Sequence, residues 1–534
     1  MSADPAVARP VEIYDTTLRD GSQAEGLSLT VADKLRVAEQ LDYLGVHYIE
    51  GGWPGANPKD AEFFARAAAG ELVLANSTLV AFGSTRKAGG VAATDPVLSD
   101  MLAAGTDVVC LVAKSAAWHV TETLRTTLDE AVAMVADSVA FLVGEGRRVF
   151  IDGEHFFDGY RSDPGFSLEV LRAALDAGAE RVIPCDTNGG TLPDEVARIV
   201  AEVVAEFGPR VGGHFHNDSG CAVANSLAAV RSGAVQVQGC INGYGERTGN
   251  ADLCSVIANL ELKVGVTTIG AERLKRLTSV AHHVAELVNL APNPHAPFVG
   301  VSAFAHKAGI HTSAIIRARD AYEHVAPEAV GNGTRFVVSE MAGRSTVALK
   351  AEQLGIELDA AAQGEVVEQL KDLEHRGYHF EVADGSLELL MRDATGWKQP
   401  YFRLESHRVI TELREDGTFV TEATIKVHVG DERVLATAEG NGPVNALDAA
   451  LRKAIGSKYP ALASVHLTDY KVRVLDTAAG TAAVTRVLID STDGERTWTT
   501  IGVSENIIEA SWAALADSVV YGLLHGASAR QDQS

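Results

Sequence analysis

The sequence predicts an α/β protein: a (β/α)8 TIM barrel, then a helical linker subdomain, then a C-terminal α+β domain with an internal ββα duplication. Three observations support this prediction. Between residues 11 and 246, short β-rich apolar runs alternate with longer stretches of helical periodicity. Eight such runs occur, which is the number of strands in a barrel of this type. Polar side chains follow the runs at their carboxyl ends, where such barrels carry their active sites.

The predicted strands are apolar segments rich in β-branched and aromatic residues. We expect them at residues 11–15, 47–52, 72–82, 107–114, 147–156, 181–186, 210–216 and 235–241. The helix after the first strand has one apolar stripe from Val31 to Leu44, and Thr30 and Gly45 are suitable residues for its two ends. The alternative fold is a doubly wound open sheet, which rarely contains eight regular units.

The chain has 534 residues and is too long for a single core. We predict the barrel at residues 1–290, the linker subdomain at 291–400 and the C-terminal domain at 401–534. From about residue 401 the pattern changes to alternating strands, and residues 432–451 are echoed by residues 495–515, each after a hairpin-like pair of runs. Two unrelated strand-to-helix units remain the alternative to a true duplication.

Charge and composition exclude several classes of partner. A net charge of −25 repels phosphate backbones and anionic lipid surfaces, so we expect no nucleic acid and no membrane partner. The first thirty residues contain no export signal, and no uninterrupted apolar run is long enough to cross a bilayer. The five cysteines are odd in number and lack C-x-x-C spacing, as in a reduced protein. We expect a cytoplasmic protein.

A candidate metal site is predicted in the stretch HFHNDSG, residues 214–220. Alternate residues of a strand point the same way, so His214 and His216 can both face the barrel axis. Asp20 follows the first strand of the same barrel, and Asn250 can add an amide oxygen. Such nitrogen and oxygen donors suit manganese, magnesium or zinc. The alternative is a hydrogen-bonded strand end without a metal.

Other polar residues of the predicted mouth are candidates for the chemistry. Arg19 would place a positive charge where an enolate or alkoxide develops, and Glu154 is suited to general acid or base catalysis. A salt bridge and a solvated carboxylate are the respective alternatives. The glycine-rich loop 241–250 could bind an acyl-carrier group or be only a turn. Beyond the barrel, His306 and His311 are catalysts or packing residues, which composition does not decide.

Five motifs resemble one family of enzymes: YDTTLRDGSQAEG (14–26), DTNGG (186–190), HFHND (214–218), GYGERTGNADL (243–253) and HKAGIH (306–311). They are similar to the acyl-CoA-condensing branch of the metal-dependent barrel lyases, the isopropylmalate, homocitrate and citramalate synthases. The resemblance covers nearly the whole chain. It implies one divalent metal ion, acetyl-CoA as co-substrate, and a Claisen-type condensation with a 2-oxo acid followed by hydrolysis of the thioester.

The resemblance also implies roles for individual residues. It assigns the metal to Asp20, His214, His216 and Asn250, the polarisation of the oxo acid to Arg19, and the acid/base chemistry to Glu154, His311 and Tyr322. We predict substrate contacts for Gln23, His119, Thr187 and Glu246. His311 is expected to act on the active site of a partner subunit in a homodimer.

Within the family, the resemblance is closest to the branch that uses pyruvate on a route to isoleucine. The stretches 48–60, 114–124 and 339–347 carry this likeness, and Trp53 or Trp118 could fill the space that a branched oxo acid needs. The duplicated C-terminal domain implies inhibition by an end-product amino acid, which we expect to be isoleucine. Isopropylmalate or homocitrate synthesis, and a lyase or aldolase on the same barrel, are the alternatives.

Overall fold

The computed structural model describes residues 10–307, 311, 314–315, 317–338, 343–475 and 483–531, and side chains up to residue 526. The chain divides into two compact units. The first contains the barrel and comprises residues up to Phe304 together with Glu323–Thr334, and the second comprises Ala305–Tyr322 and the chain from Arg335 onward. Residues 1–9 and 532–534, part of the HKAGIH motif and residues 339–342 lie outside the described residues.

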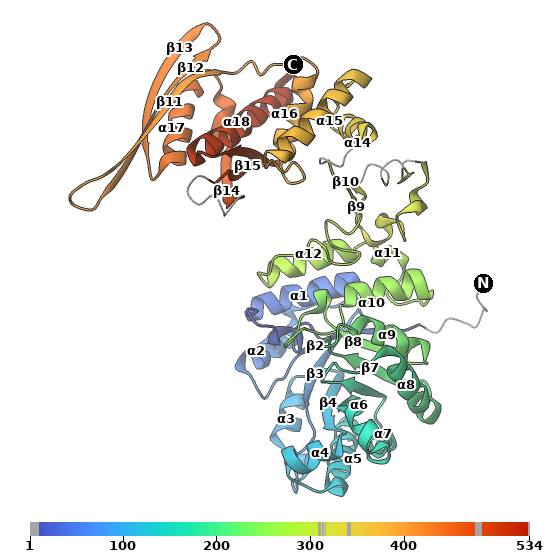
Figure 1. The fold of residues 1–534 in the computed structure, drawn as a ribbon. Coiled ribbons are helices and arrows are strands. Elements are labelled where there is room, and N and C mark those ends of the chain that lie inside the picture. Colours follow the sequence, from blue (N-terminus) through green and yellow to red (C-terminus); the bar gives the residue numbers. More distant parts are fainter. Residues whose placement is uncertain are drawn as a thin grey trace. The chain divides into compact units, whose positions relative to one another are not determined.

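The first unit is the predicted barrel, closed by eight parallel strands in sequence order (Figure 1). The strands are β1 (Glu12–Asp15), β2 (Tyr48–Gly52), β3 (Thr78–Ser84), β4 (Val108–Lys114), β5 (Arg148–Glu154), β6 (Arg181–Asp186), β7 (Gly212–Phe215) and β8 (Gln236–Gly239). β8 pairs with β1 and closes the barrel, with Ile13 beside Val237. The predicted fold is therefore confirmed.

Only the third strand begins far from its predicted position. It starts at Thr78, six residues after the expected Leu72. The Asp42 carboxylate accepts hydrogen bonds from the backbone N–H groups of residues 75, 76 and 77 and holds this segment in a loop. The apolar run in the sequence is therefore longer than the strand.

Helices surround the strands, as the alternating pattern predicts (Figure 1). They are α1 (Val31–Leu44), α2 (Pro58–Arg66), α3 (Pro96–Ala103), α4 (Ala117–His119), α5 (Leu128–Gly144), α6 (Phe156–Ser162), α7 (Pro164–Asp176), α8 (Pro193–Phe207), α9 (Ala222–Arg231), α10 (Leu253–Asn259), α11 (Ala271–Leu274) and α12 (Leu277–Leu287). Thr30 and Asp33 form a capping box at the start of α1, and Gly45 ends it with a φ of 91°. The apolar faces of these helices and the outer faces of the strands form one continuous core.

The second unit begins with a two-stranded sheet of β9 (Ala305–His306) and β10 (Arg335–Phe336). Three helices follow, α14 (Arg344–Gln353), α15 (Ala360–His375) and α16 (Asp384–Ala394), and they share a core that includes Val366 and Leu387. Glu323–Thr334 lies with the barrel unit although it falls within the predicted linker.

The C-terminal region contains two copies of one arrangement, three antiparallel strands and a helix. The first copy is β11 (Arg403–Leu413), β12 (Phe419–Val429), β13 (Glu432–Gly440) and α17 (Pro443–Ile455). The second is β14 (His466–Val474), β15 (Thr485–Thr492), β16 (Thr497–Ser504) and α18 (Ile507–Gln531). The expected ββα unit is thus a βββα unit, because the second strand of the preceding hairpin pairs with the strand before the helix.

Helix α18 is long and apolar enough to cross a membrane by length and composition alone. However, 56% of its apolar window is buried inside the protein, where Leu515, Val519 and Leu523 contribute to the core of the C-terminal region. A core helix of a soluble domain has these same properties.

Candidate active site

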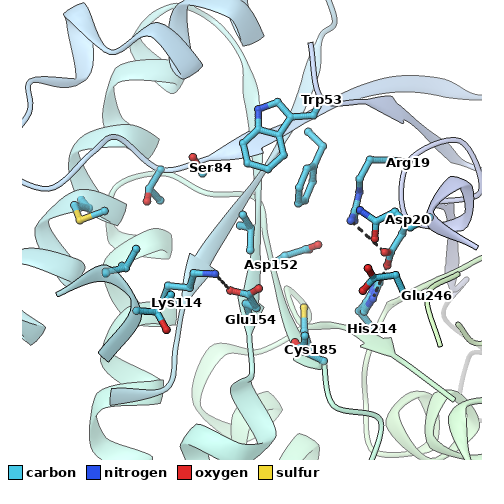
Figure 2. Close-up of a pocket in the computed structure, with 18 of the residues that line it drawn as sticks. Arg19, Asp20, Trp53, Ser84, Lys114, Asp152, Glu154, Cys185, His214 and Glu246 are labelled. Atoms are coloured by element: carbon cyan, nitrogen blue, oxygen red, sulfur yellow. Dashed lines mark hydrogen bonds and ion pairs between the residues drawn. The ribbon is translucent and has the colours of Figure 1, made fainter. Parts of the chain in front are cut away.

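A cavity of about 600 Å³ lies at the carboxyl ends of the barrel strands (Figure 2). Its lining includes eight of the predicted site residues: Arg19, Asp20, Gln23, Glu154, Thr187, His214, His216 and Glu246. These residues come from five different strand ends or from the loops that follow them. The alternation of strands and helices therefore brings together residues more than 200 positions apart, as expected for the reactive face of such a barrel.

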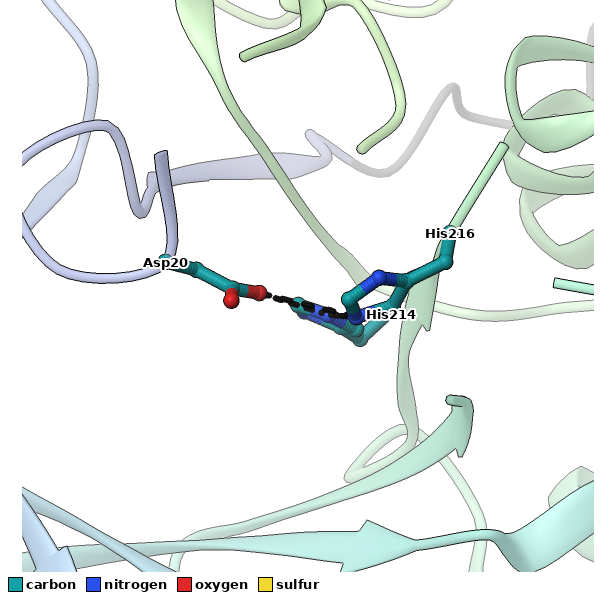
Figure 3. A group of neighbouring side chains, drawn as sticks. All are labelled: Asp20, His214 and His216. Carbon is teal, nitrogen blue, oxygen red and sulfur yellow. Dashed lines mark hydrogen bonds and ion pairs between the residues drawn. The ribbon is translucent and has the colours of Figure 1, made fainter. Parts of the chain in front are cut away.

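Asp20, His214 and His216 form a compact buried group on one side of the cavity (Figure 3). Oδ2 of Asp20 lies 3.3 Å from Nε2 of His214 and 3.6 Å from Nε2 of His216. The two Nε2 atoms are 3.0 Å apart. One carboxylate oxygen and two imidazole nitrogens thus converge, which is the donor set of many divalent-metal sites.

Electrostatics keep this group charged and asymmetric. Burial alone would raise the pKa of Asp20, but Arg19 and the two histidines outweigh it and hold that pKa well below its usual range. Burial disfavours the charged form of both histidines, yet the adjacent Asp20 raises the pKa of His214. Burial and the neighbouring His214 lower the pKa of His216 to about 4. Asp20 is therefore an anion and His216 a neutral ligand candidate at neutral pH.

The side chain of Asn250 gives a separate indication of a metal ion, because it has a buried oxygen without a donor among the described residues. Its backbone bridges to His216, and its side-chain Oδ1 is buried and accepts no hydrogen bond. A buried amide oxygen without a donor is costly, and coordination of a cation would satisfy it. Arg247 Nη2 lies 3.2 Å from Nδ1 of His216, so binding through Nε2 requires Arg247 to release Nδ1. With that movement, Asp20, His214 and His216 offer three donors to a divalent ion, and Asn250 lies beside His216 with an unpaired amide oxygen.

Arg19 is fixed next to this group by two carboxylates. Its Nε donates to Glu50 at 2.5 Å, and its Nη1 lies 3.5 Å from Asp20. The Tyr14 hydroxyl donates to the other oxygen of Glu50, and the guanidinium stacks on Phe82 at 3.9 Å from the ring centre. Burial opposes the charge of Arg19, but these carboxylates raise its pKa further above its usual value. Arg19 therefore provides a permanent, oriented cation at the cavity.

Glu154 lies on the opposite side of the cavity lining, at the end of β5 (Figure 2). Lys114, at the end of β4, forms an ion pair with its Oε2 atom, and Nδ1 of His119 lies 3.8 Å from the same oxygen. Burial and the charge of Lys114 lower the pKa of His119. His119 does not itself line the cavity. Ser115 holds the backbone carbonyl of Glu154 through its N–H and its hydroxyl.

The other predicted residues occupy less specific positions. Thr187 Oγ1 accepts a hydrogen bond of 2.9 Å from the backbone N–H of His155. Gln23 and Glu246 line the cavity from the loops after β1 and β8. Of the two tryptophans, Trp53 lines the cavity, whereas Trp118 is 45% exposed and stacks on His119.

His306, His311 and Tyr322 belong to the second unit. The rings of His311 and Tyr322 stack with their centroids 4.1 Å apart, so the structure brings together two of the predicted acid/base residues. His306 lies in the short strand β9 and packs near Phe336.

Sequence reasoning missed several residues of the site. Asp152, Phe82 and Arg247 line the cavity, and Gln238 contacts His214. Asp152 is two residues before Glu154 in β5, so the alternation of side chains along a strand could have identified it as facing the same interior. No local pattern identifies Gln238, because its role depends on the neighbouring strand.

Comparison with known proteins identifies three family matches in the chain. Residues 10–284 match the HMGL-like family, residues 298–378 the homocitrate synthase post-HMGL domain-like family, and residues 381–523 the LeuA allosteric (dimerisation) domain. The three matches lie one after another along the chain.

Three curated relatives are similar over nearly the whole chain, and all are named (R)-citramalate synthase. The Streptomyces coelicolor protein is 54% identical over 527 residues, which cover 98% of each chain. The Synechocystis protein is 52% identical over 96% of each chain, and the Aquifex aeolicus protein is 50% identical over 97% of this chain and 98% of its own. The chain therefore belongs to the (R)-citramalate synthase family and is a condensing acyltransferase.

Proposed function

We propose that the protein condenses acetyl-CoA with pyruvate and hydrolyses the resulting thioester to (R)-citramalate and coenzyme A. The observation that carries this proposal is the convergence of the Asp20–His214–His216 group, Arg19 and Glu154 on one cavity. Addition of the acetyl methyl carbon to the ketone of pyruvate, followed by hydrolysis of the thioester by water with release of the coenzyme A thiol, gives citramalate, and the relatives are named for that product.

The chain's own residues divide the chemistry between the two sides of the cavity. A carbon–carbon bond forms between the acetyl methyl carbon, after loss of one proton, and the ketone carbon of pyruvate, whose oxygen becomes an alkoxide. Arg19 is a fixed cation suited to stabilise that oxygen. Glu154, together with His311 and Tyr322 of the second unit, supplies the acid and base groups that move protons. Thr187, Gln23 and Glu246 hold the substrates.

A divalent ion bound by Asp20, His214, His216 and Asn250 would supply Lewis-acid polarisation of the ketone. Manganese or magnesium suits the nitrogen and oxygen donors, and zinc is the alternative.

The aromatic side chains of the cavity wall favour a small oxo acid as the substrate. The indole of Trp53 packs edge-on against Phe82, with the ring centres 5.6 Å apart, and both rings line the cavity. Phe82 in turn lies under Arg19. Bulky rings beside the cation that faces the substrate leave less room for the branched chain of a larger oxo acid.

The regulatory proposal rests on the C-terminal duplication and on the match to the LeuA allosteric (dimerisation) domain. We expect a cytoplasmic homodimer that isoleucine inhibits, with isoleucine bound to the C-terminal domain at residues 401–534. In that dimer, each second unit would bring His311 and Tyr322 to the partner's barrel.

The test is a panel of 2-oxo acids with acetyl-CoA, in which released coenzyme A is measured as free thiol. We expect pyruvate to give the highest kcat/KM and isoleucine to lower the rate. Trp53→Ala should raise the kcat/KM for 2-oxoisovalerate relative to pyruvate, whereas the matched Trp118→Ala should not, because Trp118 does not line the cavity.

Each outcome bears on a different part of the proposal. Thiol release with none of the oxo acids would contradict condensation itself, and a preference for 2-oxoisovalerate would contradict pyruvate. An initial rate unaffected by isoleucine, leucine or valine would contradict only the regulatory part.

A further inference from the structure

We infer that Gln238 and Asp152 are positioning residues that orient His214 for metal binding through a hydrogen-bonded relay across the barrel. The relay joins β5, β8 and β7. Nε2 of Gln238 donates to Oδ1 of Asp152 at 2.9 Å, and Oε1 of Gln238 lies 2.9 Å from Nδ1 of His214. This inference rests on the proposed metal role of His214.

The chemistry of the three groups gives the relay a direction. The amide nitrogen of Gln238 faces the Asp152 oxygen as donor, so the amide oxygen faces His214. That oxygen can only accept, so Nδ1 of His214 must carry a proton. The nitrogen that can release a proton and bind an ion is then Nε2, the atom that faces Asp20 and His216.

Burial makes this arrangement rigid. Gln238 is fully buried, and Asp152 and His214 are each 4% exposed. Water therefore cannot replace a lost partner easily, and a change at Gln238 leaves polar atoms unsatisfied on both sides.

His216 has no equivalent support. Its Nδ1 lies 3.2 Å from Nη2 of Arg247, which can only donate, so that nitrogen accepts rather than donates. Arg247 is an exposed residue of the glycine-rich loop and is also bound to Asp218. The relay therefore makes His214 the ligand whose tautomer the barrel itself determines.

Strand β8 offers a matched control. Gln236 is two residues before Gln238, is equally buried, and also donates to a carboxylate, Glu12, at 3.2 Å. It lies at the other end of the strand and contacts neither histidine. Replacement of either glutamine by methionine keeps the approximate volume and removes a buried amide that donates to a carboxylate. Oε1 of Gln236 has no partner among the described residues, so Gln236→Met removes the donor alone, without a histidine contact.

The experiment measures Mn²⁺ affinity of the full-length protein by calorimetric titration without substrates, together with the thermal unfolding midpoint. Gln238→Met should weaken Mn²⁺ binding by about 10- to 100-fold, the usual effect of losing a group that orients a metal ligand. Gln236→Met should leave the affinity within about twofold of wild type. Asp152→Asn, which keeps an oxygen acceptor, should weaken binding less than Asp152→Ala.

The variant His214→Ala distinguishes a wrong metal site from a wrong relay. If His214→Ala binds Mn²⁺ as tightly as wild type, the proposed metal site is wrong, and the relay inference is wrong as well. If His214→Ala loses the metal but Gln238→Met binds it normally, or if both glutamine variants weaken binding equally, the relay is wrong and the metal site stands. Should Gln238→Met not fold, the ratio between Asp152→Asn and Asp152→Ala decides, and equal affinities would overturn the inference.

Discussion

The two sides of the active-site cavity are built differently. On the metal side, the side chains of Asp20 and His214 are each about 5% exposed, and each has several polar partners in the barrel interior. On the opposite side, Glu154 and Lys114 are 23% and 22% exposed and pair with each other. The metal side is shielded from water, whereas Glu154 and Lys114 are open enough to meet a substrate. We therefore expect variants of the first side to lose binding and variants of the second to lose turnover.

The largest effect is expected from Asp20→Ala. The substitution removes the anion on which both histidines converge, so metal content and turnover should fall together, with kcat/KM reduced by about 10³-fold or more, the equivalent of several kcal/mol of transition-state stabilisation. Elemental analysis of the purified protein and the thiol assay measure the two losses. A variant that keeps its metal and its activity would remove the distinction between the two sides.

Glu154→Gln should lower kcat by about 10²- to 10⁴-fold, the range for loss of a general acid or base, and should leave the metal bound. The glutamine has nearly the same shape but cannot take a proton. Steady-state kinetics with metal analysis check this prediction. Loss of metal would show that Glu154 belongs functionally to the metal side.

Lys114→Met should have a smaller effect, about 5- to 10-fold in kcat, because the ion pair with Glu154 is partly exposed and such pairs contribute about 1 kcal/mol. KM for pyruvate and the metal content should change little. Lys59→Met is the control, since its Nζ donates to the carbonyl of Leu29 outside the cavity. Equal kinetics for the two variants would mean that Lys114 does not support Glu154.

The smallest effect on turnover is expected from Asp15→Asn, at the end of β1. Burial raises the pKa of the Asp15 carboxyl to about 7, although Thr17 donates two hydrogen bonds to it. The folded state therefore binds this proton more tightly than the unfolded state, and stability falls as pH rises from about 4 to 7. Between pH 5 and 7 the free energy of unfolding should fall by about 2 kcal/mol.

Asparagine at position 15 does not titrate, so the variant should lose this part of the pH dependence. Urea unfolding of both proteins at pH 5 and pH 7 measures it. The same pH dependence in wild type and variant would assign the titration to another group.

Local sequence determined much of this site because its residues lie at strand ends. The spacing of His214 and His216 places both side chains on one side of the chain at the end of β7, and the count of strands places Asp20 near them across β8. The helix that begins at Thr30 and ends at Gly45 was equally predictable, since capping depends on adjacent residues.

Contacts between strands were not predictable in this way. The pairing of Lys114 with Glu154 and the relay from Asp152 through Gln238 to His214 depend on how neighbouring strands are registered and on which side chains meet across the barrel. The start of β3 depended on Asp42, more than thirty residues earlier.

The sequence by itself therefore determined the alternation of strands and helices, the motif residues and the face on which they lie, because these follow from periodicity and local capping. Only the tertiary structure decided which atoms of those residues meet. Closure of the barrel brings together side chains that are far apart in the chain, and the orientation of a buried amide such as Gln238 is set by both of its neighbours at once.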